Sequence, residues 1–304
     1  MPHVTVGVDG SAESAAAAEW AAREAVLRKV ALRLVLAADS PDPPRGGADE
    51  GDSADDVLTG TARALRTGYP GLGVRADRLS GRPAAVLARE AAGAELVVLG
   101  SRGLGSVRGF LLGSVAMATI VETDPPVVLV RPRHGPRPKD EAYTPPLVAD
   151  LPGSDRHHRE AAEGSGPVVV GVDVREACEP VLDFAFGEAA LRGCRLRAVH
   201  SWSLPPFGRD ALALDMALRE MRPDVVAELG KVLAPWRRRY PSVEVDELTP
   251  VGGVSEQLVH AAEGAALVVV GRRVRTSRFG AHVGPVTHAV IHHCDSPVAV
   301  VAHD

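Results

Sequence analysis

The residues with the clearest chemical potential lie in one stretch, VVLGSRGLGSVRGFLLGSVAMATI, at positions 97–120. Its key positions are Gly100, Gly103, Gly113 and Ser114. Glycine has no Cβ, so its backbone adopts positive φ readily and lets another group approach closely. The stretch also holds Arg102 and Arg108 and has no acidic residue between positions 101 and 110. These features favour an anionic ligand, and phosphate in particular.

The residues after Gly113 strengthen this interpretation, because an apolar run of helical period begins there. The first N–H groups of a helix have no intrahelical partner and carry partial positive charge, so they bind anions. Taken singly, Gly100 is explained as a strand end, Gly113 with Ser114 as a helix cap, and Arg102 as a surface residue. The combination favours a ligand site.

Two common phosphate motifs are missing. No Lys precedes Ser114, so GxxxxGK[ST] is not formed, and Arg108 stands where GxGxxG, started at Gly103 and Gly105, needs its third glycine. The first expected turn, DGSAES, also lacks the glycine pair of pyrophosphate-forming ATP enzymes. Hydride transfer and kinase chemistry therefore have no support.

Composition narrows the class of protein. A chain of 304 residues suits two domains, and 34 basic against 39 acidic side chains, a formal charge of -5, offer no general attraction to nucleic acid or anionic lipid. Three cysteines without a CxxC fit neither a disulfide framework nor a metal site. The opening MPHVTVGVDG lacks a signal pattern, and no apolar run reaches membrane-spanning length. We expect a cytoplasmic protein with no nucleic-acid or membrane partner.

The chain contains one long unit twice. The matched segments are VTVGVDG (4–10) with VVVGVDV (168–174), GAELVVLG (93–100) with GAALVVVG (264–271), and DPPVVLV (124–130) with DSPVAVV (295–301). The first pair is offset by 164 residues and the other two by 171. A unit of this length is a domain duplication. We predict a first domain over 1–131, a linker rich in Pro and charge over 132–166, and a second domain over 167–304.

Within each unit, β-branched runs alternate with Ala/Leu-rich stretches of helical period, which predicts an α/β fold of two tandem doubly wound, Rossmann-like domains. The expected strands of the first unit are Val4–Val8, Leu32–Leu36, Val74–Leu79, Leu96–Leu99 and Val127–Val130. The expected helices are Ser14–Lys29, Asp55–Arg66, Pro83–Ala92 and Ser114–Glu122. The second unit repeats this with a longer helix over 224–240, whose apolar face holds Val225, Leu229, Val232 and Trp236. The acidic segment 39–56 is expected to be a mobile loop.

Ligands of doubly wound sheets bind beyond the carboxyl ends of the strands, where the winding direction reverses. The first and fourth strands should flank that point. Asp9 follows the first and Gly100 ends the fourth, so the glycine stretch is expected at the crevice.

At these residues the chain resembles the universal stress protein family. The family's ATP-binding pattern is a glycine, two residues, a glycine, nine residues, then glycine with Ser or Thr, and the stretch from Gly100 to Ser114 matches it throughout. The resemblance extends to GVDGS in the first turn, GRPAAVL at 81–87 and PPVVLV at 125–130, and to both units. It implies five parallel strands per domain in the order 3-2-1-4-5, with helices on both faces.

The resemblance also implies site residues. Gly7, Val8 and Asp9 would border the adenosine, and Ala37 would lie against the adenine. Ribose and phosphates would contact Gly100, Ser101, Arg102, Gly103, Leu104, Gly105 and Ser106. The phosphates would also contact Gly113, Ser114 and Val115. The cofactor is ATP, with Mg²⁺ held mainly by its phosphates, and neither catalytic residues nor protein metal ligands are expected.

The second unit departs from the pattern. It reads GRRVRTSRFGAHVGP, so Val274 replaces Gly103 and Pro285 replaces Ser114. A β-branched residue resists positive φ, and proline removes a donor N–H. We expect this site to bind ATP weakly or not at all. Its loop arginines (Arg272, Arg273, Arg275, Arg278) are expected on a solvated face, and His288 with His292 are interpreted as structural histidines, not a metal pair.

The resemblance favours an ATP-binding, nucleotide-dependent regulator in the stress response, without dedicated catalysis. Two alternatives stay open: a slow ATP hydrolase that uses Asp9, and a nucleotide-independent interaction module. The apolar last strands, Val127–Val130 and Val298–Val301, are expected at sheet edges, where unpaired backbone invites pairing. We predict that they pair within the chain to form a pseudo-dimer; whether whole chains also form a homodimer stays open.

Overall fold

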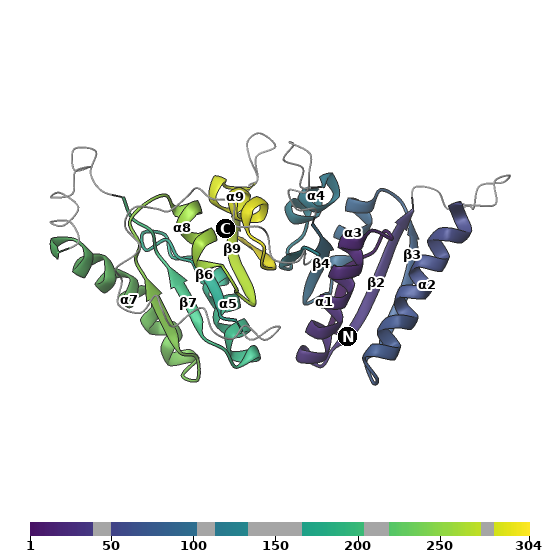
Figure 1. Cartoon of the computed structure of the whole chain (residues 1–304), viewed down its shortest axis with the longest axis horizontal. Helices are drawn as coiled ribbons and strands as arrows, with labels where there is room; N and C mark the ends of the chain where they lie inside the picture. The colour runs from purple at the N-terminus through teal and green to yellow at the C-terminus, as the bar shows by residue number, and fades with distance from the viewer. Residues whose placement is uncertain (39–49, 102–112, 133–165, 204–218, 275–282) are drawn as a thin grey trace, which may run out of the picture.

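The computed structural model describes most of the chain (Figure 1). The described ranges are 1–38, 50–101, 113–132, 166–203, 219–274 and 283–304. The predicted linker, 132–166, therefore lies outside the described residues except at its two ends. In these ranges, no helix is both long and apolar enough to cross a membrane.

The described strands form one sheet that runs through both halves of the chain. In the first half they are β1 (His3–Gly7), β2 (Ala31–Ala38), β3 (Val74–Ser80), β4 (Leu96–Gly100) and β5 (Val127–Val130). In the second half they are β6 (Val168–Gly171), β7 (Leu196–Val199), β8 (Val245–Leu248), β9 (Leu267–Arg273) and β10 (Val298–His303). The order across the sheet is β3-β2-β1-β4-β5-β10-β9-β6-β7-β8. Each half thus has the order expected from the sequence, with parallel neighbours.

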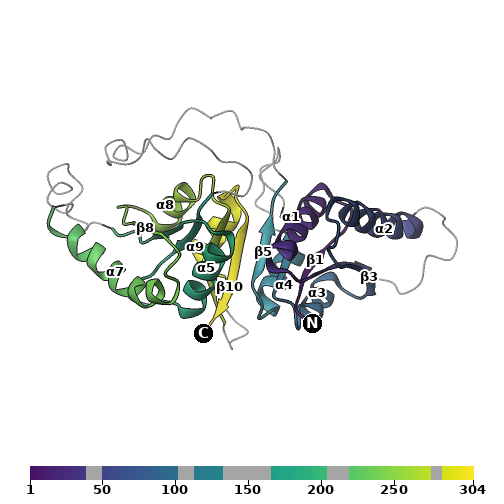
Figure 2. The ribbon, with the colours of Figure 1, turned by 90° about the horizontal axis from the view of Figure 1, so that it is seen from below.

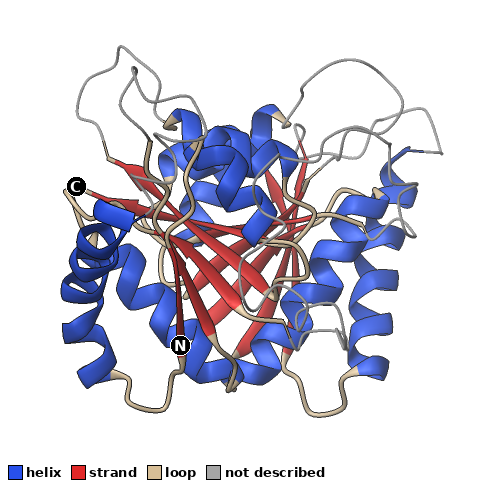
Figure 3. Ribbon diagram, turned by 60° about the vertical axis from the view of Figure 1, so that its left-hand side comes forward, coloured by secondary structure: helices blue, strands red, loops and turns tan. Residues whose placement is uncertain are grey.

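Helices cover both faces of this sheet (Figure 3). They are α1 (Ala12–Arg28), α2 (Glu50–Gly68), α3 (Pro83–Ala91), α4 (Ser114–Glu122), α5 (Glu179–Arg192), α7 (Arg222–Arg239), α8 (Val254–Ala261) and α9 (Pro285–His293). Side chains of α1, α2, α5 and α7 share one buried apolar cluster, which is continuous across the two halves. Those of α3, α4, α8 and α9 share a second cluster on the other face.

Two sequence expectations about helices are corrected. The segment 39–56 is not a loop throughout, because α2 begins at Glu50. The described part of α2 is held against the sheet, because Asp55 accepts a hydrogen bond from Arg78 of β3 at 2.9 Å. In α7, the predicted face is confirmed at Leu229, which is fully buried, and at Val232 and Trp236, which pack against the core. The predicted set lacked Leu233, which is also fully buried.

The two halves meet where β5 and β10 pair in antiparallel orientation, side by side at the centre of the molecule (Figure 2). The register places Val298 opposite Leu129 and Val300 opposite Val127. Every residue of β5 is buried. The apolar last strands thus cover each other's edges, which is the pairing expected from the sequence.

We call the contact between β5 and β10, with the helices beside it, the seam. On one face of the sheet, buried ion pairs connect α1 and α5 across this seam. Glu24 and Arg28 on α1 are related by the 164-residue offset to Glu188 and Arg192 on α5. Each arginine pairs with the glutamate of its own helix and with that of the other helix, with Arg28 Nε at 2.7 Å from Glu24 and Arg192 Nη2 at 2.6 Å from Glu24. Both glutamates are 3% exposed. Burial raises the pKa of the Glu188 carboxyl, against the pull of Arg192 and Arg28.

We predict that Glu188→Gln destabilises the protein by about 3 kcal/mol, because the buried Arg28 and Arg192 would each lose one of their carboxylate partners and share Glu24. The change is measured as the free energy of unfolding in urea. Glu228→Gln is the control, since it breaks an exposed pair with Lys231 and should leave the unfolding midpoint unchanged. Equal behaviour of the two variants would contradict a structural role for the buried cluster.

Candidate functional site

The predicted site residues that the structure describes gather at one edge of the first half. Strands β2, β1 and β4 are parallel neighbours, so their carboxyl ends share an edge. That edge carries Gly7, Val8 and Asp9 after or within β1, Ala37 in β2, and Gly100 with Ser101 at the end of β4. Helix α4 connects β4 to the parallel strand β5, so its first residue, Ser114, starts from the same edge.

Asp9 lies exposed beyond β1 and is held by the first turn of α1. Its Oδ1 accepts hydrogen bonds from the Ser11 N–H at 3.0 Å and from the Ser11 hydroxyl at 2.6 Å. The Asp9 N–H donates to Ser14 Oγ at 3.3 Å, and Ser11 caps α1 by accepting from the Ser14 N–H. Gly10 has φ of 83°, which sharpens the turn. The carboxylate therefore has a fixed orientation at the sheet edge.

Ser11 and Ser14 are supporting residues that the sequence analysis missed. The signal was present, because a serine followed three residues later by another polar residue is a common start of a helix. Their effect is to connect the orientation of Asp9 to the position of α1.

Gly100 differs from its expected role. It has no positive φ. A Cβ there would lie 2.5 Å from the Glu13 carbonyl carbon and 2.8 Å from the Ser14 backbone nitrogen. The missing side chain therefore admits the first turn of α1, where a close approach by the ligand had been expected. This contact brings the Asp9 turn against the end of β4.

Beyond Gly100, Ser101 is 3% exposed and its N–H donates to the Val130 carbonyl at 2.8 Å. The remaining loop residues of the predicted site lie outside the described residues. They are Arg102, Gly103, Leu104, Gly105 and Ser106.

Helix α4 presents an open N-terminus. Gly113 is its N-cap, with φ of -55° and ψ of 139°, and glycine offers no side chain to the free N–H groups. Gly113 and Ser114 are exposed, whereas Val115 is half-buried. Among the described residues, which leave out 102–112, no atom lies within 4 Å of a Cβ placed on Gly113. The first turn has free N–H donors that suit an anion.

The remaining predicted site residues lie at the carboxyl ends of β1 and β2: Gly7, Val8 and Ala37. A Cβ on Gly7 would lie 2.8 Å from Leu99 Cδ2, so glycine lets the β4 side chain pack across β1. The Val8 N–H donates to the Val35 carbonyl at 2.9 Å, which keeps β1 and β2 together at their ends. Ala37 packs on the α3 face of the sheet.

In the second half, the strand after the equivalent glycine does not stop. β4 ends at Gly100, whereas β9 continues past Gly271 through Arg272 and Arg273, which pair with Ala302 and His303 of β10. The Val274 N–H then donates to the His303 carbonyl at 2.6 Å. The backbone of residues 272–274 thus takes part in pairing with β10, whereas a phosphate-binding loop would turn away from the sheet at this point.

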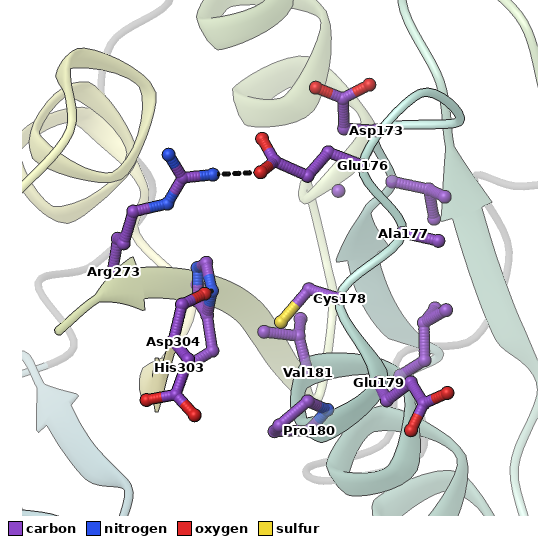
Figure 4. Close-up of a pocket in the computed structure, with 14 residues that line it drawn as sticks. Asp173, Glu176, Ala177, Cys178, Glu179, Pro180, Val181, Arg273, His303 and Asp304 are labelled. Atoms are coloured by element: carbon purple, nitrogen blue, oxygen red, sulfur yellow. Dashed lines mark hydrogen bonds and ion pairs between the residues drawn. The ribbon is translucent and has the colours of Figure 1, made fainter.

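A cavity of about 560 Å³ lies at the carboxyl ends of β6 and β9 (Figure 4). Carboxylates dominate its charge: Asp173, Glu176, Glu179 and Asp304 line it. Arg273 also lines it and is paired with Glu176. This lining repels a triphosphate. Helix α9, like α4, begins after a glycine without a side-chain cap, but Pro285 at its first position removes one N–H donor.

The arginines of the second loop are not all on a solvated face. Arg272 is only 5% exposed, and its Nη2 donates to the Thr123 carbonyl at 2.8 Å. Burial lowers the pKa of its guanidinium, although Asp124 partly opposes this. Arg273 is exposed, as expected, whereas Arg275 and Arg278 lie outside the described residues.

His288 and His292 do share one face of α9, with ring centroids 4.3 Å apart. Among the described residues, no group of three or more His, Cys, Asp or Glu side chains is arranged to hold a metal ion. His292 is buried, and burial together with His288, Arg131 and His293 lowers the pKa of its imidazole.

Comparison with known proteins gives a consistent family match. The model of the universal stress protein family matches residues 1–131 and 165–302. Universal stress protein Rv2623 of Mycobacterium tuberculosis is 33% identical over 310 residues, which cover 98% of this chain and 95% of that protein. Universal stress protein Rv2005c of the same species is 30% identical over 314 residues, with 98% and 96% coverage.

Solved structures agree at the level of the fold. The structure of a universal stress protein from Archaeoglobus fulgidus superposes with a TM-score of 0.66 at 16% sequence identity. The superposition covers 99% of this chain and 98% of the Archaeoglobus chain. A functionally unknown protein, PA1789 from Pseudomonas aeruginosa, has a TM-score of 0.60 and 14% identity, with 99% and 92% coverage.

We predict that Gly100→Ala destabilises the protein by about 2 kcal/mol, because the new Cβ collides with backbone that must shift. Gly113→Ala is the matched control, since its Cβ meets no atom of the residues that the structure describes. Unfolding in urea measures both. A Gly100→Ala protein as stable as Gly113→Ala would show that α1 does not depend on this close approach.

The lowered pKa of His292 predicts acid sensitivity. The unfolded imidazole titrates near its ordinary value of 6.5 and the folded one below it, so the unfolded state takes up the proton first and stability falls as the pH drops through this window. His292→Gln should flatten the loss of unfolding free energy between about pH 7.5 and about pH 5.5. His260→Gln, on the exposed surface of α8, serves as control. An unaltered slope for His292→Gln would contradict the assignment.

Proposed function

Because the chain belongs to the universal stress protein family, we propose that its first half binds ATP and that occupancy of this site regulates the protein's interactions in the stress response. The binding region is the edge where Asp9, the end of β4 and the start of α4 meet. The second half binds ATP weakly or not at all and acts as a partner domain. No dedicated catalytic step is assigned.

The open start of α4 carries this proposal. A nine-residue helix begins at Ser114, beyond an exposed glycine that supplies no capping side chain. Backbone N–H groups at a helix start stabilise phosphate charge, and the Ser114 hydroxyl adds one donor. None of the residues that the structure describes would block a Cβ at Gly113, so none of them blocks the approach of an anion to these donors there.

The donor chemistry fits a nucleoside triphosphate. Asp9 is exposed and oriented, which suits it to a ribose hydroxyl or to the metal ion carried by the nucleotide. Ala37 leaves a small apolar surface at the end of β2 for a planar base. Mg²⁺ would be held mainly by the phosphates, where it neutralises part of their charge.

Slow ATP hydrolysis is the second candidate, and Asp9 is the residue that favours it. Its carboxylate is exposed at the sheet edge and is oriented by Ser11. It would act as the general base that accepts a proton from the attacking water. Hydrolysis would then require Asp9 and saturate with ATP.

We predict that Asp9→Ala weakens ATP·Mg²⁺ binding about tenfold, the effect of losing one charge-assisted contact. Gly113→Ala should weaken it by a similar factor of about ten, because the new Cβ would stand between the phosphates and the N–H groups of the first turn. Isothermal titration calorimetry measures the affinity, and mass spectrometry identifies any nucleotide that co-purifies. For the wild-type protein, affinity should fall from ATP to ADP to AMP, because the phosphates supply the contacts at α4.

The duplication provides matched controls. Asp173 follows β6 as Asp9 follows β1 and accepts from the Arg175 N–H at 2.9 Å, and Gly284 caps α9 as Gly113 caps α4. Asp173→Ala and Gly284→Ala should leave ATP binding unchanged. Unaltered melting of the wild-type protein on addition of ATP would overturn the proposal and favour a nucleotide-independent interaction module. Saturating, Asp9-dependent release of phosphate would favour the hydrolase.

A further inference from the structure

A buried arginine of the second half caps the helix that begins the proposed phosphate site in the first half. Arg272 Nη2 donates to the carbonyl of Thr123, the C-cap residue of α4, at 2.8 Å. The two residues are 149 positions apart. Both are almost fully buried, at 5% and 3% exposed. A cation at the C-terminus of a helix stabilises its dipole and satisfies a carbonyl that has no intrahelical partner.

Hydrogen bonds continue from this cap along the buried face of α4. Thr123 Oγ1 donates to the Thr119 carbonyl at 2.8 Å, and Thr119 Oγ1 donates to the Val115 carbonyl at 2.8 Å. Thr119 is fully buried. This threonine ladder, Thr119 and Thr123, joins the Arg272 cap to Val115 in the first turn of the helix. The helix has nine residues, so the two ends are about 13 Å apart.

The equivalent helix of the second half lacks this ladder. At the 171-residue offset, Val290 replaces Thr119 and Cys294 replaces Thr123, and both are buried. The cap itself is reciprocal, because Arg131 of the first half donates to the carbonyls of Ile291 and His292 at the end of α9, at 2.6 and 2.7 Å. Each half thus donates one arginine to the last helix of the other half. Of the two helices, only α4, which Arg272 caps, contains the threonine ladder.

We propose that Arg272 is a positioning residue for the ATP site of the first half, acting through α4 and its threonine ladder. This inference rests on the function proposed above and assigns a role to the second half within it. Strand β9 of the second half continues where β4 of the first half turns. From this strand, Arg272 holds α4 of the first half in place.

The physical basis is the cost of ordering a short helix. Isolated helices of this length are unstable in water, so α4 depends on contacts at its ends and along its buried face. A helix that is already held in place binds a ligand without the loss of entropy that ordering would require. By linkage, nucleotide at the first turn of α4 in turn strengthens the contact between Arg272 and Thr123.

The test compares Arg272→Met with Arg131→Met in the full chain. Both variants remove a buried arginine cap across the seam, but only the first cap lies on α4. We expect Arg272→Met to weaken ATP·Mg²⁺ binding about fivefold, a typical lower value for coupling between sites, and Arg131→Met to leave it within about twofold. Thermal unfolding of both proteins establishes that each variant is folded.

A second readout does not need nucleotide. Amide hydrogen exchange of residues 114–122 should become about fivefold faster in Arg272→Met than in wild type, because the helix opens more often without its cap. Arg131→Met should leave these amides unchanged and accelerate those of α9. Thr119→Val, which keeps the side-chain shape but removes the ladder donor, should accelerate exchange of the hydrogen-bonded amides of residues 118–122 in α4. Arg272→Lys keeps the charge and a donor and should recover most of the affinity.

The outcomes separate the two proposals. Wild-type protein that binds no ATP would overturn the proposed function, and the exchange experiment would still decide whether Arg272 orders α4. A folded Arg272→Met protein with unchanged α4 exchange would overturn the present inference even if ATP binds normally. Equal loss of affinity in Arg131→Met would overturn it as well, because it would show a general weakening of the seam.

Discussion

The antiparallel pairing of β5 with β10 is the interaction on which the remaining architecture depends. It converts two five-stranded sheets into one and buries the apolar strands that would otherwise form open edges. The two outer strands that remain, β3 and β8, carry charged side chains within the sequences VRADRLS and VDEL. Charged side chains on an edge strand disfavour pairing with a further strand. The two halves therefore join through the apolar strands β5 and β10, whereas the charged strands β3 and β8 form the outer edges of the sheet.

Both faces of the seam are closed by arginines, but in different ways. On the face of α1 and α5, residues related by the duplication form a cluster in which each charge meets two opposite charges. On the face of α4 and α9, Arg131 and Arg272 occupy positions that the duplication does not relate, and each caps the last helix of the other half. The ion-pair cluster therefore follows the symmetry of the duplication, whereas the two helix caps do not.

Much of this was accessible from the sequence. The β-branched runs predicted the positions of the strands, since a parallel sheet covered on both faces needs continuous apolar strands. The apolar last strands at the expected sheet edges, together with the family resemblance, predicted the pairing of β5 with β10. Other features depend on contacts that local patterns do not encode. The composition of 39–56 concealed the start of α2 at Glu50, and the glycine motif did not reveal that α1 packs against Gly100. The ligand contact at Gly100 stays a prediction. Arg272 read as a surface arginine, because its partner lies 149 residues away. The sequence-based assignment of the loop residues 102–106 to ribose and phosphates stays a prediction, because they lie outside the described residues.

The central claim is that one crevice per chain holds a triphosphate, at the start of α4. A crystal structure of the protein grown with ATP and Mg²⁺ tests it most directly. The account predicts electron density for one nucleotide in each chain, with its phosphates at the N–H groups of residues 113–115 and its ribose beside Asp9, and no nucleotide between β6 and β9. Nucleotide density in the acidic cavity of the second half, with the first crevice closed by protein side chains, would contradict it.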